Sequence, residues 1–97
     1  MSKLTFSLKR EWIDEAKKEF GNPIRKLERI VQEFADAKLS MSSYSSLTVE
    51  VPEEKRTALY ERIVELLSDK FQMEEPWKVL TVSGDIEKMS LKGEAFP

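Results

Sequence analysis

Apolar and polar residues alternate at the beginning of the chain and then change to a helical spacing. Leu4, Phe6 and Leu8 are separated by polar residues, which is typical of a strand with one apolar face. From Arg10 onward the apolar residues recur every three or four positions, and Gly21 is a residue type that often follows a helix end. This pattern predicts a strand over residues 4–8 and a helix that ends near residue 20.

A second helix is predicted directly after the first. Asn22 can accept a hydrogen bond from the first turn, and Pro23 suits the first helical position because its φ is already fixed. An apolar stripe then continues at helical spacing to about Lys38. Its members are Ile24, Leu27, Ile30, Val31, Phe34 and Ala35.

The second half of the chain repeats the change from alternation to helical spacing. Leu47, Val49 and Val51 alternate with polar residues, and Pro52 followed by two glutamates is typical of a helix start. A wide apolar face then predicts a helix that is mostly buried. The predicted order is strand 47–51, helix 52–71, strand 77–82, a turn at 83–85 and a returning strand at 86–91.

A serine-rich segment, residues 39–46, separates the two halves and contains five serines. Such sequences favour loops, so we interpret it as a linker or loop. The predicted fold class is α+β, with a strand-helix-helix unit at residues 1–38 followed by a small β-α-β-β unit at residues 47–97. Residues 1–38 carry nine Lys or Arg and seven Asp or Glu, whereas residues 39–97 carry seven and eleven. A mildly basic unit therefore precedes an acidic one.

The residue types leave few means of catalysis. The chain has no Cys and no His, so disulfides, thiolate metal ligands and the commonest general base are excluded. The paired carboxylates Glu53-Glu54 and Glu74-Glu75 are sequence neighbours, which would point about 100° apart on a helix and would not converge on one substrate atom. We expect a binding protein rather than an enzyme, with no catalytic residue, no metal site and no cofactor.

The chain also lacks the signals of a membrane or exported protein. No apolar run approaches the roughly 18 residues that a membrane span needs. The first residues, Met1-Ser2-Lys3-Leu4, lack the apolar core of a secretion signal. We therefore expect a cytoplasmic protein without a membrane partner.

The order of motifs at the start of the chain carries a family likeness. It consists of Leu4-Thr5-Phe6-Ser7-Leu8, a helix, the turn Gly21-Asn22-Pro23, and Leu27 six residues beyond the glycine. Residues 4–35 thereby resemble the ribbon-helix-helix fold of small DNA-binding repressors such as the MetJ and Arc proteins. In that family two copies pair their first strands into an antiparallel ribbon that enters the major groove. The resemblance implies a homodimeric regulator of transcription that binds double-stranded DNA.

The resemblance also implies roles for individual residues. The side chains that would face base edges are Thr5, Ser7 and Lys9. Those that would contact phosphates are Lys3, Asn22, Arg25 and Lys26. The start of the second helix would add its backbone amides, because a helix start has unpaired N–H groups and a positive dipole end.

A second hypothesis stays open, because any strand with one solvated face shows the alternation seen at residues 3–9. In this hypothesis the first strand joins the later strands in one sheet. The acidic C-terminal half then docks onto a basic protein partner, as in an inhibitor or adaptor, and an antitoxin would combine this with DNA binding. The two hypotheses differ in whether the first strand pairs with its symmetry mate or with strand 47–51 or 77–82.

Overall fold

The computed structural model describes residues 1–93 and 95. Its strands are β1 (Ser2–Leu8), β2 (Lys38–Ser42), β3 (Ser46–Val51) and β4 (Leu80–Gly84). Its helices are α1 (Arg10–Phe20), α2 (Pro23–Gln32) and α3 (Arg56–Asp69), with short 3₁₀ turns at Glu53–Lys55 and Pro76–Lys78. The predicted α+β fold class is confirmed. Within the described residues no helix has the length and apolar character needed to cross a membrane.

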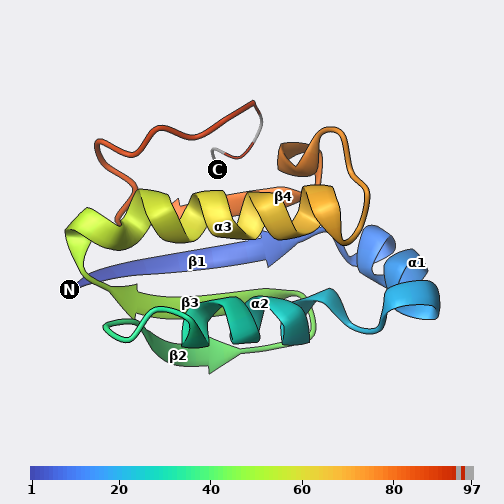
Figure 1. Ribbon diagram of the computed structural model, residues 1–97, viewed down its shortest axis with the longest axis horizontal. Helices are drawn as coiled ribbons and strands as arrows, with labels where there is room; N and C mark the ends of the chain where they lie inside the picture. Colours follow the sequence, from blue (N-terminus) through green and yellow to red (C-terminus); the bar gives the residue numbers. More distant parts are fainter. Residues whose placement is uncertain (94, 96–97) are drawn as a thin grey trace.

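The strands form one antiparallel sheet in the order β2-β3-β1-β4. β1 lies inside the sheet, with Phe6 opposite Leu47 of β3 on one side and opposite Val82 of β4 on the other. Figure 1 shows α2 over β3 and β2, and α3 over β1 and β4, so that the helices cover one face of the sheet. This connectivity is that of the split β-α-β motif, with two helices in the first crossover.

The core lies between the sheet and the helices. The alternation in β1 has the expected effect: Phe6 is fully buried against the helices, whereas Thr5 and Ser7 are half-buried on the opposite face. The helix predicted in the second half is present as α3, but only one side of it is buried in this core, and Leu66 is half-exposed. The buried apolar residues of α3 are Leu59, Tyr60, Ile63 and Leu67.

The turn between α1 and α2 follows the predicted chemistry. Gly21, which ends α1, has a φ of +81°, a region that favours glycine. The side chain of Asn22 accepts a hydrogen bond from the Ile24 amide at 2.8 Å, and Pro23 occupies the first position of α2. These caps place α2 so that its apolar side lies on the sheet.

The serine-rich segment differs from its prediction. Lys38–Ser42 forms β2, and only residues 43–45 make the loop that joins β2 to β3. Every residue of β2 is exposed. Leu39 and Met41 alternate with polar residues, but a register irregularity between them places them on opposite sides of the sheet, so β2 has no single apolar face. The two predicted units also share one sheet and one core rather than standing apart.

Three predicted boundaries are wrong for local reasons. α2 ends at Gln32 instead of near Lys38, because the chain then makes tight turns in which the amides of Glu33 and Phe34 bond to carbonyls three residues back. Trp77 lies in a 3₁₀ turn, and β4 starts at Leu80. Residues 86–91 form no strand: Glu87 and Lys88 make a turn, in which Lys88 has a φ of +67° that a strand does not allow.

Candidate functional site

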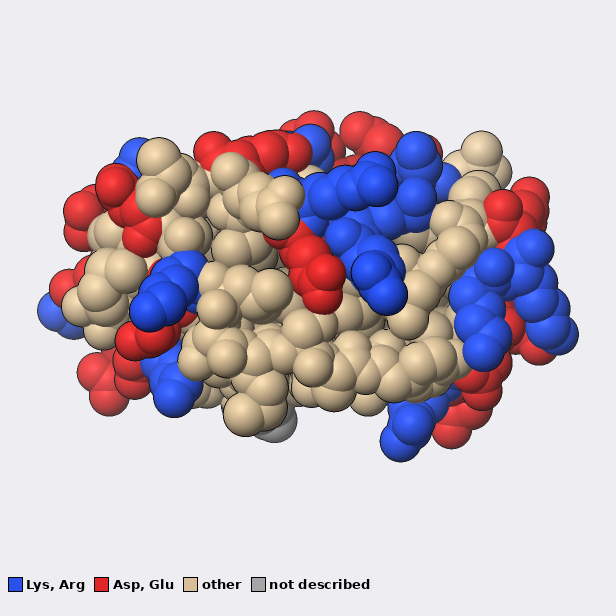
Figure 2. Space-filling model, turned by 90° about the horizontal axis from the view of Figure 1, so that it is seen from below, with Lys and Arg blue, Asp and Glu red and all other residues tan. Residues whose placement is uncertain are grey.

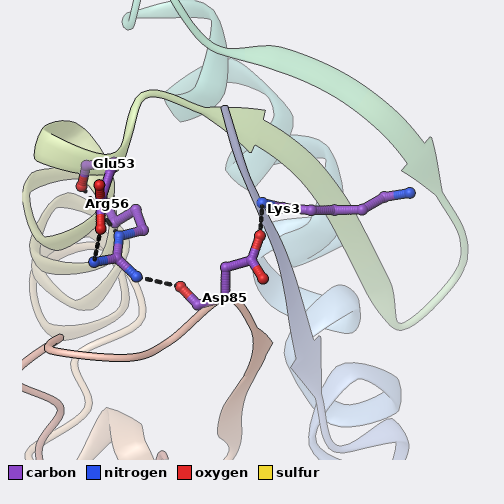
Figure 3. A network of polar contacts seen from close by, with 4 residues as sticks. All are labelled: Lys3, Glu53, Arg56 and Asp85. Atoms are coloured by element: carbon purple, nitrogen blue, oxygen red, sulfur yellow. Dashed lines mark hydrogen bonds and ion pairs between the residues drawn. The ribbon is translucent and has the colours of Figure 1, made fainter.

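One buried charged side chain, Arg56, organises a polar network at the end of the sheet (Figure 3). Its guanidinium donates to the carbonyl of Glu53 at 3.1 Å and to the carbonyl of Asp85, and it lies 3.6 Å from the Glu53 carboxylate. The Asp85 carboxylate accepts from the Lys3 amide at 2.8 Å, and the Asp85 amide donates to the Lys3 carbonyl at 2.9 Å. The network therefore ties the start of α3 to the ends of β4 and β1.

The cavity beside Arg56 does not suit an anionic ligand. It has a volume of about 360 Å³, and its charged lining residues are Arg56, Glu53, Asp85 and Glu87. Three carboxylates outnumber one guanidinium, and the guanidinium already donates to protein carbonyls. We therefore assign Arg56 to stability. The described residues also contain no group of acidic side chains placed to hold a metal ion.

Replacing Arg56 by methionine is expected to lower the free energy of unfolding by about 2–4 kcal/mol, because two carbonyls in part-buried hydrogen bonds lose a charged donor. Urea denaturation of the purified variant measures this loss. Arg62→Met is the control, because Arg62 pairs with Glu33 and Glu65 where its side chain is 35% exposed. Such pairs are worth about 1 kcal/mol or less. Equal losses in the two variants would contradict the structural role of Arg56.

The uncovered face of the sheet is rich in hydroxyl groups. The strand registers place Thr48 of β3, Thr5 of β1 and Ser83 of β4 side by side, and the two threonine hydroxyls lie 3.0 Å apart. The next row contains Ser46, Ser7 and Thr81. No aromatic side chain lies on this face in the described part of the sheet. Four-stranded sheets that bind single-stranded RNA stack bases on such aromatic side chains, so this face lacks the means for that recognition.

The structure separates the residues predicted to bind DNA. Lys3, Thr5 and Ser7 lie on the uncovered face of the sheet, since they alternate with the buried residues of β1. Lys9 lies beyond the strand, at the start of α1. Arg25 and Lys26 belong to α2 and so lie on the helical side of the sheet. Within one molecule Lys3 therefore shares a surface with Thr5 and Ser7, whereas Arg25 and Lys26 lie on the opposite side of the sheet.

The start of α2 has no obvious place for a phosphate. Pro23 has no N–H, the Ile24 amide donates to the Asn22 side chain, and the Arg25 amide donates to the Asn22 carbonyl at 3.2 Å. Asn22 therefore caps the helix from within the chain. The amides that the family likeness assigned to phosphate binding are already occupied.

The first strand is not available for a ribbon between two copies. β1 pairs with β3 along one edge and with β4 along the other, and a strand has only two hydrogen-bonding edges. In this fold the first strand thus pairs within its own chain. Of the two pairings considered from the sequence, the structure shows the one with the later strands.

The sheet has two outer strands, and they differ in how their edges are treated. The outer edge of β4 is covered by the C-terminal segment, because the Val82 amide donates to the carbonyl of the buried Ala95 at 2.9 Å. β2 pairs with β3 on one side and, within the described residues, with no strand on the other. The edge of β2 therefore presents a row of backbone groups that another strand can use.

β2 also carries exposed apolar side chains. The described chain has three large apolar residues classed as exposed, and two of them are in this strand: Leu39 at 40% and Met41 at 67%. The registers place Leu39 on the helical side of the sheet, opposite buried Val49, and Met41 on the uncovered side, opposite Thr48. An irregularity in the register falls between these residues. A strand added at this edge would cover both side chains.

The loop after β2 is fixed to α1. The Tyr44 hydroxyl donates to the Asp14 carboxylate, and the cations of Arg10 and Lys17 lie 5.3 and 5.2 Å from the centre of the Tyr44 ring. The interaction with the Tyr44 hydroxyl raises the pKa of Lys17 above its ordinary value of 10.5. These contacts hold the end of β2 in a defined position. Between it and the start of α2 lies an open groove of about 430 Å³, lined by Arg25, Glu28 and Ser42 among others.

Sequence reasoning missed β2 as a candidate site. The sequence signal that was present is the pair of apolar residues, Leu39 and Met41, within the serine-rich segment. Comparisons of this chain with protein-family models, with curated proteins and with solved structures found no match. The function is therefore inferred from the geometry of the sheet edge at β2.

Proposed function

We propose that this chain is a non-enzymatic protein-binding module that accepts an extended segment of a partner protein as a fifth strand beside β2. The observation that carries the proposal is an exposed edge strand bearing Leu39 and Met41, while the opposite edge of the sheet is covered. In strand addition the backbone hydrogen bonds supply affinity, and the side chains beside the edge supply selectivity.

This surface differs from the acidic one expected from the sequence. The exposed carboxylates of α3, such as Glu61 and Asp69, lie on a convex helix surface, and Glu65 is paired with Arg62. β2 instead offers backbone groups that pair with no other strand of the described residues, and it also offers apolar contact area. We therefore still propose an inhibitor or adaptor, but one that docks through β2 and not through the acidic C-terminal half.

The proposal predicts that a variant whose β2 edge cannot pair with another strand binds peptides more weakly than the wild type. Peptides of about ten residues would be selected from a random display library on the wild-type protein, and their affinities measured by fluorescence anisotropy. Replacing Leu39 and Met41 together by lysine is expected to weaken binding at least about tenfold, since edge lysines oppose strand pairing. Both side chains are exposed, so the variant should fold.

The matched control for this test is Thr81→Lys with Ser83→Lys, which adds the same charge to β4 at the other edge of the sheet. Its peptide affinities should stay within about twofold of the wild type, because surface changes away from a site have small effects. If both variants lost peptide affinity equally, or if the β2 variant lost none, the peptides would bind at a surface other than β2.

DNA binding stays a prediction of the sequence, and a titration of fluorescent duplex DNA at two salt concentrations tests it. Our proposal predicts no specific complex. A complex that weakens steeply with salt, and that is lost when Lys3, Lys9, Arg25 and Lys26 are neutralised together, would favour the DNA-binding function instead.

A further inference from the structure

The side of α2 beside β2 carries two arginines that form no ion pair within the described residues. The Ser42 hydroxyl donates to the Glu28 carboxylate at 2.6 Å, which shows that this side of α2 reaches the end of β2. Arg25 lies one helical turn before Glu28 and lines the same groove, and Arg29 lies one turn beyond Arg25. Both arginines are exposed. Arginine side chains are long enough to extend past the edge of the sheet.

The charges on this side are unbalanced. Glu28 keeps its negative charge although it accepts from the Ser42 hydroxyl, and Glu33 is paired with Arg62 of α3, so two arginines on this side of α2 accompany one carboxylate. Neither Arg25 nor Arg29 forms an ion pair with any carboxylate of residues 1–93 and 95. Figure 2 views the molecule from the α2 and β2 side, and it shows a group of Lys and Arg side chains, with Asp and Glu side chains beside it, above a broad band of uncharged residues.

We infer that the partner segment carries carboxylates on the side chains that face α2. This inference rests on the proposed strand addition at β2. Successive residues of an added strand point to opposite faces of the sheet. The partner residues on the helical side would lie next to Leu39 and near Arg25 and Arg29. The partner residues on the uncovered side would lie next to Met41. The fitting segment therefore alternates acidic and aliphatic residues.

A second copy of the chain is a poorer occupant of the same edge. Two β2 strands paired antiparallel would form one continuous sheet with the helices of both copies on the same face. The two α2 helices would then be neighbours, and each would present two arginines, Arg25 and Arg29, against one carboxylate, Glu28. Like charges facing each other oppose association, whereas an acidic segment would neutralise them.

Two synthetic peptides test the inference: an acetylated, amidated Glu-Val sequence repeated five times, and the matching Lys-Val sequence. The backbone amides of ¹⁵N-labelled protein report where each peptide binds, and anisotropy reports its affinity. We expect the acidic peptide to shift the amides of β2 and to bind at least about tenfold more tightly than the basic peptide, with an affinity that falls as salt is raised.

A variant with reversed charges on α2 tests whether the two arginines cause the preference for an acidic peptide. Arg25→Glu with Arg29→Glu should weaken the acidic peptide about tenfold or more and strengthen the basic one. Lys70→Glu with Lys92→Glu changes the net charge equally beside α3, at the other side of the molecule, and should leave the preference intact. Both variants alter exposed side chains only.

The outcomes separate this inference from the proposed function. If both peptides shift the β2 amides equally and charge reversal has no effect, strand addition stands and the acidic preference is wrong. If neither peptide shifts these amides, the inference fails, and the library peptides alone then decide whether strand addition is right. A dimer in ultracentrifugation that is abolished by Leu39→Lys with Met41→Lys would make a second copy the occupant and overturn the inference.

Discussion

Replacing Phe6 by aspartate is expected to unfold the whole chain at 25 °C. Phe6 is fully buried in a central strand, between Leu47 and Val82, and an isolated carboxylate there has no partner. The lost ring packing, about 3–5 kcal/mol, and the buried polar group, about 2–7 kcal/mol, together match the roughly 5–15 kcal/mol that stabilises a domain of this size. Circular dichroism and the amide spectrum of α3 measure the outcome.

Thr5→Asp is the matched control, because Thr5 precedes Phe6 and faces the uncovered side of the sheet. It should stay folded with a loss of about 1 kcal/mol, the range of strand surface preferences. The pattern of unfolding also distinguishes the two pairings of the first strand. In a shared sheet α3 unfolds together with β1. If Phe6→Asp disrupted residues 1–38 and left α3 intact, the two halves would be independent units and the single sheet would be wrong.

Replacing Gly84 by alanine is expected to lower the free energy of unfolding by about 2–4 kcal/mol, since a strained backbone costs about 1–3 kcal/mol and a steric clash adds to it. Gly84 has a φ of +99°, and a Cβ atom there would lie 2.4 Å from the Lys3 carbonyl oxygen. That carbonyl accepts from the Asp85 amide, so relief of the clash would disturb the junction of β1 and β4. Thermal and urea denaturation measure the loss.

Gly21→Ala isolates the contribution of the clash. Gly21 also has a positive φ, +81°, but a Cβ atom there would meet nothing within 4 Å. Its loss should be about 1–3 kcal/mol, the cost of the strained backbone alone, since Gly21 combines a positive φ with a ψ of 176°. If alanine were equally tolerated at both positions, the close approach of Gly84 to Lys3 would be refuted.

The sequence predicts those elements whose local pattern and caps agree. β1, α1, α2 and α3 each have one apolar side that the core covers, and Asn22 and Pro23 act as predicted at the start of α2. The pairing of β1 is different, because a ribbon between two copies and a strand within one sheet both bury Leu4 and Phe6. Local periodicity contains no information about which strand lies alongside.

The candidate site could not be predicted because it depends on that pairing. β2 is an outer strand exposed on both faces, and its alternation is short, with only Leu39 and Met41 between serines that favour a loop. Its role becomes visible only from the sheet order, which makes β2 an edge, and from Ala95, which covers the other edge. Arg25 and Arg29 likewise become candidate binding residues only when the structure shows that α2 lies beside β2.

Hydrogen exchange of the backbone amides, measured with and without a library-selected peptide, tests the binding of a partner strand at β2 most directly. Strand addition forms new backbone hydrogen bonds, so exchange should slow in Lys38–Ser42 and stay unchanged in β1, which is already paired on both edges. Protection that appears only in α3 or at the outer edge of β4, with β2 unchanged, would contradict the account.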